Sequence, residues 1–364
     1  MKFALNDEQQ ALSDATKDYF TSKVTSDLIR TAMVSDAGYN KDLFRSLCNE
    51  LGLASLVIPE EYGGFGAGDV ELAVALEHHG YVLAPTPLRT HATSAFALLE
   101  CATHEAKQKY LPLIATGEAL CYTDYFSEST NSVEITNVAN GQAVRIPFGL
   151  DTKYLFLYKH GSLHVIDLES AGIERKSIPS IDQTLPLSNL IFNSVPVELV
   201  SDSDITEQFK RAQSRAVVAA ANEMVGSTQA VLDMSVAYAK DRTQFGRPIG
   251  SFQAIKHKCA DMLLETESAR SVAMYAAWLS SQEVAFTSED LEDDLGHISS
   301  MAKYYTSKTF SHVTGENIQI HGGIGFTFEH DAHLYFKRAA FMAVHLGTVD
   351  EHSQNLAKEM LDRV

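Results

Sequence analysis

The chain has 364 residues, of which 45% are hydrophobic, and its formal net charge is −18. This size and hydrophobic content allow a large core and predict two or three domains. The negative charge argues against non-specific binding to nucleic acid or acidic membranes, and no run of about 18 apolar residues is present to predict a membrane span.

The N-terminal residues and the spacing of the cysteines indicate in which cellular compartment the protein is found. Residues 1–8 carry acidic side chains early and lack the apolar segment of a secretion signal. Cys48, Cys101, Cys121 and Cys259 are far apart and form no C-x-x-C motif. Such cysteines are typical of free thiols under reducing conditions, so we expect a cytoplasmic protein.

The first third of the chain has the spacing of amphipathic helices. The segments with helical periodicity are residues 6–33, 41–51, 69–80 and 91–116. Residues 59–66, Pro-Glu-Glu-Tyr-Gly-Gly-Phe-Gly, interrupt them and predict a structural turn, and residues 83–87 predict an extended break. Gly117 is expected to end this all-helical domain, which we assign to residues 1–119.

From residue 120 to 205 the period changes to the alternation typical of strands. The segments predicted as strands are residues 133–138, 154–158, 163–168 and 190–192. Asn140-Gly141 is a hairpin signal, and residues 160–162 are expected to join two of the strands. Four prolines punctuate the region. A small β-barrel or β-sandwich fits this middle domain.

Helical periodicity returns in the C-terminal domain, residues 206–364. The segments are residues 206–240, 252–284, 295–318 and 333–362, which predict a four-helix bundle. The acidic stretch 288–294 is expected to cap and solvate a helix start, with partner binding as the alternative.

The chain must turn between the first two helices of this bundle, because Gly246, Pro248 and Gly250 fall within five residues. Arg242 is expected at the end of one helix, and Ser251 is expected to cap the next. A guanidinium beside the backbone donors of a turn suits an anion such as phosphate. The alternative is a helix corner whose arginine pairs with an acidic neighbour.

Two blocks resemble the acyl-CoA dehydrogenase family. Residues 242–253, Arg-x-Gln-Phe-Gly-x-Pro-Ile-x-x-Phe-Gln, resemble its flavin signature, and residues 319–326, Gln-Ile-His-Gly-Gly-Ile-Gly-Phe, resemble a second block at the expected distance. Residues 80–88 are similar to a bacterial branch that often supplies the smaller subunit of mixed tetramers in steroid and bulky acyl-CoA breakdown. The resemblance implies a mainly α fold with a central β domain: an N-terminal helical domain, a middle β-barrel and a C-terminal four-helix bundle.

The resemblance also implies which residues hold FAD. The cofactor-binding residues expected from it are Arg242, Gln244, Phe245, Ile249, Gln253, Gln319, Gly322, Gly323 and Thr348. Most would contact a neighbouring subunit's FAD, with the glycines allowing a close approach. The alternative for the second block is a helix stop with a glycine turn.

The chain differs from the family at the residue that serves as the catalytic base. Acyl-CoA dehydrogenation needs a carboxylate that takes the α-proton. The two family positions for this glutamate correspond to Leu346 and Ala216, and neither holds a carboxylate. Glu223, seven residues after Ala216 and on roughly the same helix face, is the remaining candidate base. An interhelical ion pair is the other interpretation of Glu223.

The segments expected to contact the flavin ring also differ from those of the family. The strand expected at residues 121–124 continues into a loop without glycine, and the family's Trp-Ile-Thr segment is absent, since Trp278 is the only tryptophan. Thr123 is either a flavin contact or an ordinary strand residue. His321, His330 and His333 lack an accompanying thiolate or carboxylate in the spacing of a known metal site, so no metal is expected.

The sequence therefore predicts a subunit of an FAD-dependent acyl-CoA dehydrogenase that introduces an α,β double bond into an acyl-CoA thioester. A partner subunit would supply the glutamate base in a heterotetramer, and an electron-transfer flavoprotein would accept the electrons. Two alternatives stay open: a self-sufficient flavin dehydrogenase, as a homo-oligomer, with Glu223 as a relocated base, and a flavin-free structural or regulatory protein.

Overall fold

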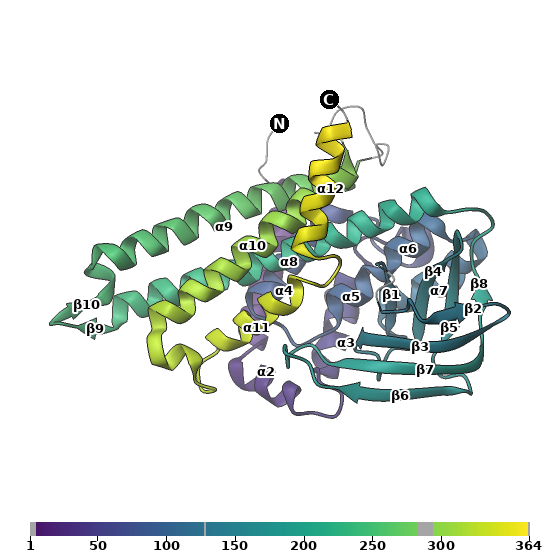
Figure 1. Ribbon diagram of the computed structural model, residues 1–364, viewed down its shortest axis with the longest axis horizontal. Helices are drawn as coiled ribbons and strands as arrows, with labels where there is room; N and C mark the ends of the chain where they lie inside the picture. Colours follow the sequence, from purple (N-terminus) through teal and green to yellow (C-terminus); the bar gives the residue numbers. More distant parts are fainter. Residues whose placement is uncertain (1–4, 127–128, 283–293, 363–364) are drawn as a thin grey trace.

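The computed structural model describes residues 5–126, 129–282 and 294–362. Short N-terminal helices and two β-sheets lie beside a bundle of long helices, as Figure 1 shows. This arrangement confirms the expected fold, mainly α with a central β domain.

The N-terminal part is all helical. Its helices are α1 (Asp7–Lys23), α2 (Ser26–Met33), α3 (Lys41–Asn49), α4 (Asp69–Tyr81), α5 (Leu88–Ala92), α6 (Ser94–Cys101) and α7 (His104–Thr116), with 3-10 turns η1 (Leu53–Ser55) and η2 (Glu60–Tyr62). The helix predicted over residues 6–33 is two helices, because Thr25 caps a new start by accepting from the N–H of Leu28. Gly117, with φ of 66°, ends α7 as predicted.

The β region consists of two four-stranded sheets. One has the order β1-β4-β5-β8 and the other β2-β3-β7-β6. The strands are β1 (Cys121–Asp124), β2 (Val133–Ile135), β3 (Val138–Pro147), β4 (Tyr154–Lys159), β5 (Ser162–Asp167), β6 (Ile173–Ile178), β7 (Leu187–Pro196) and β8 (Glu198–Leu199). Residues such as Leu155 and Phe192, from different sheets, share one buried core. The two sheets form a sandwich rather than one closed barrel.

The predicted turns of this region had different outcomes. His160 and Gly161 both have positive φ, 53° and 76°, and join β4 to β5 as predicted. The hairpin predicted at Asn140-Gly141 is wrong, because both residues lie within β3 and pair with β2. The ladder shifts register there, and Asn140 Oδ1 accepts the N–H of Ser194 at 2.8 Å. The Asn-Gly pair therefore serves a β-bulge instead of a turn.

The C-terminal part is built on three long helices and two shorter ones. They are α8 (Thr206–Asp241), α9 (Gln253–Ser280), α10 (Leu295–His321), α11 (Ala332–Met342) and α12 (Val349–Asp362), with the 3-10 turn η5 (Gly322–Phe326) after α10. The predicted fourth helix breaks where Leu346 and Gly347 adopt positive φ, 60° and 85°. Asp294 caps α10, as expected of the acidic stretch, whose other residues lie outside the described ones.

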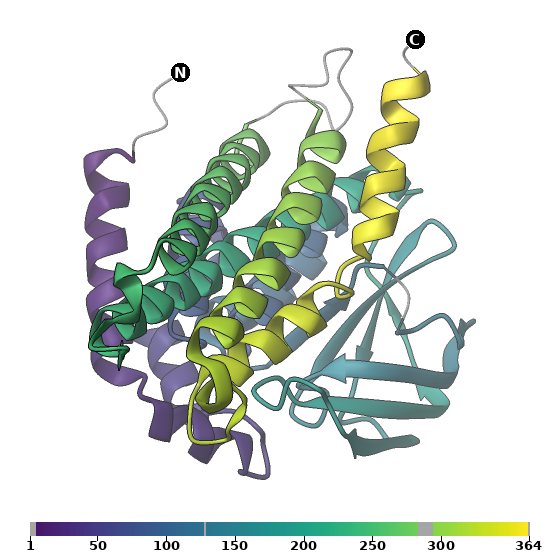
Figure 2. The same ribbon diagram turned by 60° about the vertical axis from the view of Figure 1, so that its left-hand side comes forward.

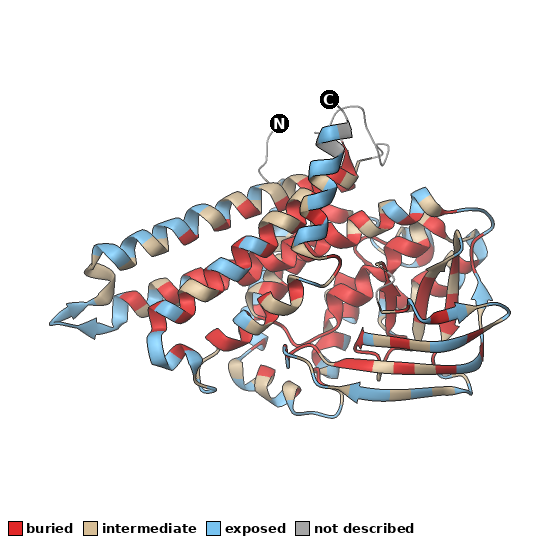
Figure 3. Cartoon of the chain, in the orientation of Figure 1, coloured by how far each residue is buried: buried red, intermediate tan, exposed pale blue. Residues whose placement is uncertain are grey.

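Helix α8 is the centre of the molecule. Its 36 residues span about 54 Å, and its middle is buried along much of its length in Figure 3. It crosses α4 at a pair of glycines: a Cβ on Gly226 would lie 1.7 Å from the carbonyl oxygen of Glu77, and one on Gly80 would lie 2.0 Å from that of Glu223. Only glycine permits this approach, so the backbones of α4 and α8 come into direct contact here.

The other long helices extend away from this crossing. Figure 2 shows α9 and α10 running side by side, with α12 rising near the β-sheets. Among the described residues, no helix combines the length and apolar character needed to cross a membrane.

Candidate functional site

The first sequence block forms a hairpin at one tip of the bundle. Strands β9 (Thr243–Gln244) and β10 (Arg247–Pro248) pair between α8 and α9, and they project at the far left of Figure 1. Phe245 and Gly246 make the turn with φ of 52° and 77°. Positive φ at both central residues matches the twist of a two-residue hairpin.

Arg242 lies where the sequence predicts, at the C-cap of α8. Its side chain is exposed, and no described carboxylate forms an ion pair with it, so the alternative of an acid-paired corner does not describe the structure. The cap predicted at Ser251 is wrong. Phe252 occupies the N-cap of α9, and the hydroxyl of Ser251 is buried without a hydrogen-bond partner.

Phe245 is held in a costly conformation. A non-glycine residue with positive φ costs about 1 kcal/mol or more, and the ring is 91% exposed. Its one aromatic neighbour among the described residues is Phe252, edge-on at 6.1 Å between ring centres. The exposed face of Phe245 is therefore free for a planar ligand or a partner surface.

The fold brings the second block to the same end of the bundle. The rings of Tyr238, one turn before Arg242, and His321, the last residue of α10, stack 4.2 Å apart. Gly322 and Gly323 follow directly, both exposed, and a Cβ added at either would meet no atom within 4 Å. Gly322 also ends the helix with φ of 62°, so the helix-stop interpretation holds alongside the open approach.

This end of the chain fits the phosphate end of FAD. An exposed guanidinium, the exposed amides of Gln244, Gln253 and Gln319, and unobstructed glycines make a donor set suited to phosphate oxygens. Ile249 is half-buried beside them. Thr348 lies elsewhere, at the start of α12, where its hydroxyl donates to Glu351 at 2.9 Å.

Neither of the two positions expected to hold the base, Leu346 and Ala216, offers a proton acceptor. Leu346 is 8% exposed in the loop between α11 and α12, with its carbonyl accepting from His352 Nε2 at 2.9 Å. Ala216 is 1% exposed within α8. Both side chains are hydrocarbon, and both pack in the main core.

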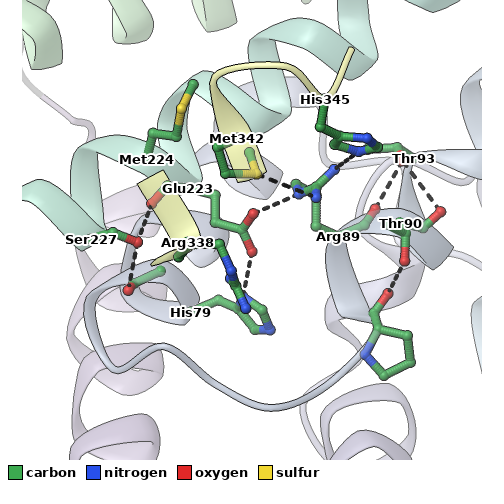
Figure 4. Close-up of polar contacts among 12 residues, drawn as sticks. His79, Arg89, Thr90, Thr93, Glu223, Met224, Ser227, Arg338, Met342 and His345 are labelled. Carbon is green, nitrogen blue, oxygen red and sulfur yellow. Dashed lines mark hydrogen bonds and ion pairs between the residues drawn. The ribbon is translucent and has the colours of Figure 1, made fainter. Parts of the chain in front are cut away.

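Glu223 lies near this region, inside a buried ion cluster shown in Figure 4. One carboxylate oxygen accepts from His79 Nδ1 at 2.8 Å, and the other accepts from Arg89 Nε at 2.5 Å. Arg89 Nη1 lies 3.3 Å from Nε2 of His345, the residue before Leu346. Glu223, His79 and Arg89 are each less than 5% exposed.

The cluster keeps Glu223 ionised. Burial by itself would raise the pKa of Glu223, but the charge of Arg89 and the hydrogen bond from His79 outweigh it and hold that pKa well below its usual range. Such a carboxylate is a weak base. The geometry supports the interpretation of Glu223 as an interhelical ion-pair partner.

A second ion pair extends the cluster into the β-sandwich. Arg338 on α11 pairs with Asp182, from the loop between β6 and β7, and donates to Thr184 Oγ1 at 2.7 Å. Arg338, Glu223 and Arg89 line a cavity of only about 10 Å³. A space of that size holds one water molecule. The N-terminal helices, the β-sandwich and the C-terminal helices therefore meet with almost no empty space between them.

The sequence did not identify Arg89, His79, Arg338 or Asp182 as members of this cluster. Arg89 and Glu223 are 134 residues apart, and nothing in their local pattern pairs them. The available signal was the charge of Arg89 within residues 80–90, which carry no other charged side chain.

The other residues singled out in the sequence include Thr123, His321 and His330. Thr123 lies in β1 with its hydroxyl buried and without a hydrogen-bond partner among the described residues, which fits a flavin contact as well as an ordinary strand residue. His321 and His330 pack ring against ring at 4.5 Å. Within the described ranges, no group of three or more His, Cys, Asp or Glu side chains is placed to hold a metal ion.

Comparison with known proteins agrees with this architecture. Residues 6–118 match the model of the acyl-CoA dehydrogenase N-terminal domain, and residues 207–361 match that of the acyl-CoA dehydrogenase C-terminal domain. The chain is 33% identical to acyl-CoA dehydrogenase IpdE2 of Mycolicibacterium smegmatis, covering 98% of this chain and 100% of that protein. It is 32% identical to IpdE2 of Mycobacterium tuberculosis, covering 97% and 98%.

Solved structures share the fold. The Tcur3481-Tcur3483 steroid ACAD has a TM-score of 0.87 at 23% identity, covering 98% of each chain. The ChsE4-ChsE5 complex from Mycobacterium tuberculosis has a TM-score of 0.86 at 21% identity, covering 99% of each chain. With both domain models matched in order and a relative 33% identical over nearly the whole length, the chain belongs to the acyl-CoA dehydrogenase family, whose members are FAD-dependent enzymes.

Proposed function

We propose that this chain is the subunit without the base in an acyl-CoA dehydrogenase made of two kinds of subunit. It contributes Arg242, Phe245 and the Gly322-Gly323 turn to an FAD shared across an interface. A partner subunit supplies the glutamate that takes the α-proton of the acyl-CoA thioester. Bound FAD would supply the acceptor for the hydride of the β-carbon.

The main support is the lack of a proton acceptor at Leu346 and Ala216, together with the small cavity beside Glu223. Leu346 and Ala216 cannot accept a proton, and Glu223 is occupied by Arg89 and His79. The cavity of about 10 Å³ beside Glu223 is far smaller than the ~300 Å³ or more of a typical ligand pocket. In contrast, the hairpin and the glycine turn remain exposed and unobstructed.

The names of similar proteins suggest the substrate class. A structural neighbour is a steroid ACAD, and another is the two-component ChsE4-ChsE5 complex. We propose a bulky, ring-bearing or branched acyl-CoA as substrate and a heterotetramer in the cytoplasm as the assembly. An electron-transfer flavoprotein is the proposed electron acceptor, and one similar protein is named as a subunit of a caffeyl-CoA reductase-Etf complex.

The test is purification of the chain alone and together with the partner subunit encoded beside it. We expect the chain alone to be inactive and to bind no FAD, and the complex to absorb at 450 nm and to dehydrogenate acyl-CoA. A yellow and fully active homo-oligomer of this chain would contradict the proposal. A complex without flavin absorbance would favour the structural or regulatory alternative.

Glu223 as a relocated base is tested separately in the complete enzyme. A Glu223→Gln variant that stays folded and retains FAD under the assay conditions should keep its turnover within about twofold, because no proton passes through this residue in the proposal. A fall in turnover by orders of magnitude with FAD still bound would support the self-sufficient alternative.

A further inference from the structure

The register of the hairpin places a second arginine beside Arg242. Gln244 pairs with Arg247 in the antiparallel ladder, and the N–H of Ile249 donates to the carbonyl of Arg242 at 2.8 Å. Directly paired residues direct their side chains to the same face, and so do alternate residues along a strand. Arg242, Gln244 and Arg247 therefore share one face of the hairpin.

The guanidinium of Arg247 is held in place by an aromatic ring. Its Cζ lies 4.1 Å from the centre of the Phe252 ring, and Phe252 itself contacts Phe245 edge-on. Stacking of this kind restrains an otherwise flexible side chain and leaves the edge of the guanidinium free to donate hydrogen bonds. Arg247 is exposed, so these donors face outward.

The charges on this face lack a counter-ion within the chain. Among the residues that the structure describes, no carboxylate forms an ion pair with Arg242 or Arg247. This is notable in a chain with 47 acidic and 29 basic side chains. Two guanidiniums on one small hairpin repel each other, and an anion that carries two charges would stabilise both.

We infer that Arg247 is a second cationic contact for the diphosphate bridge of the shared FAD, next to Arg242. This rests on the proposed function, and it assigns a residue that the sequence motif left unassigned. The diphosphate carries two negative charges, which match the two guanidiniums, and the amide of Gln244 on the same face of the hairpin is an additional donor. Bidentate hydrogen bonds explain why arginine is suited to this position.

The experiment compares FAD affinity in the assembly that the chain forms with its partner subunit, after removal of FAD. The variants are Arg242→Gln, Arg247→Gln, Arg247→Lys and the control Arg45→Gln. Arg45 is an exposed arginine on α3 that pairs with Asp42, so its replacement makes the same chemical change away from the hairpin. FAD is titrated by its fluorescence, and the size of the assembly is measured by gel filtration.

Both hairpin glutamine variants should weaken FAD binding about tenfold or more, because charge-assisted hydrogen bonds are lost. Arg247→Lys should be intermediate, since it retains the charge but loses the planar fork, and Arg45→Gln should match the wild type. Weakening by the two glutamine variants should be greater at low salt than at high salt.

The outcomes separate this inference from the proposed function. If Arg242→Gln leaves FAD affinity unchanged, the proposed half-site itself fails. If Arg242→Gln weakens binding and Arg247→Gln behaves like Arg45→Gln, only the role of Arg247 is overturned. If Arg247→Gln dissociates the assembly while FAD affinity per assembled complex is unchanged, Arg247 contacts the partner protein, and the inference is also overturned.

Discussion

The Oε2 atom of Glu223 lies 2.5 Å from Nε of Arg89, with each side chain only 4% exposed. This contact joins α8 to α5, and the neighbouring pair of Arg338 with Asp182 joins α11 to the β-sandwich. Ions buried this deeply persist only when each has its partner, because the charges cannot be solvated. The cluster therefore connects three parts of the chain: the N-terminal helices, the β-sandwich and the C-terminal helices.

Replacing Glu223 by Gln should destabilise the chain by about 3 kcal/mol or more, because it leaves the Arg89 guanidinium buried without its counter-charge. Urea unfolding at pH 7.5 measures this loss. The control is Glu207→Gln, since Glu207 is exposed and pairs only with Lys210 one turn away. Its effect should stay below about 0.5 kcal/mol. Equal effects of the two variants would contradict a structural role for the buried pair.

Two glycine-to-alanine substitutions should change the stability of the fold in opposite directions, one at the crossing of α4 and α8 and one within α10. Ala at position 226 would place its Cβ 1.7 Å from the carbonyl oxygen of Glu77, so Gly226→Ala should separate the helices and destabilise the fold by several kcal/mol. Gly315, within α10, has no atom within 4 Å of an added Cβ. Gly315→Ala should stabilise by about 0.5–1 kcal/mol through helix propensity. Thermal unfolding of both variants distinguishes crowding from propensity.

Protonation of His91 should lower the free energy of unfolding in acid. Burial lowers the pKa of His91 to about 4, and the ring donates through Nε2 to Ile114 O at 2.9 Å while Nδ1 accepts the N–H of Cys121 at 3.1 Å. Protonation would break the second bond. Because the folded pKa is below the unfolded value of 6.5, the unfolded chain binds more protons between these values, and stability falls as pH falls from about 6.5 to 4.

The contribution of His91 over this range is about 3 kcal/mol. Urea unfolding at pH 7.5, 6 and 5 should show a smaller loss on acidification for His91→Gln than for the wild type, since the variant has no proton to gain. The same slope for both proteins would mean that His91 titrates normally in the folded chain.

Phe245 should contribute to binding and not to folding. The ring is 91% exposed, so Phe245→Ala should change the free energy of unfolding by less than about 0.5 kcal/mol. In the assembled enzyme, the same variant should bind FAD more weakly. Phe96→Ala, at a position 1% exposed, is the contrasting variant and should cost about 3–5 kcal/mol. A large loss of stability for Phe245→Ala would show that the hairpin supports the fold.

Local patterns in the sequence were sufficient for most of the architecture. Helical spacing identified α8 and α10 to within a few residues, and the glycines after residue 320 correctly indicated the end of α10. The turn at His160-Gly161 was also predicted, because positive φ is a local requirement. The Asn140-Gly141 turn was missed, because strand pairing with β2 decided how that dipeptide is used.

By itself, the sequence determined the family and the order of helices and strands, and it showed no glutamate at the two positions expected to hold the base. These depend on residue identity and on spacing along the chain. Only the tertiary structure decided what Glu223 does and which arginines remain unpaired. The physical reason is that burial and ion pairing depend on segments more than a hundred residues apart. Folding brings Arg89 onto Glu223, and it leaves Arg242 and Arg247 exposed without an acidic partner among the described residues.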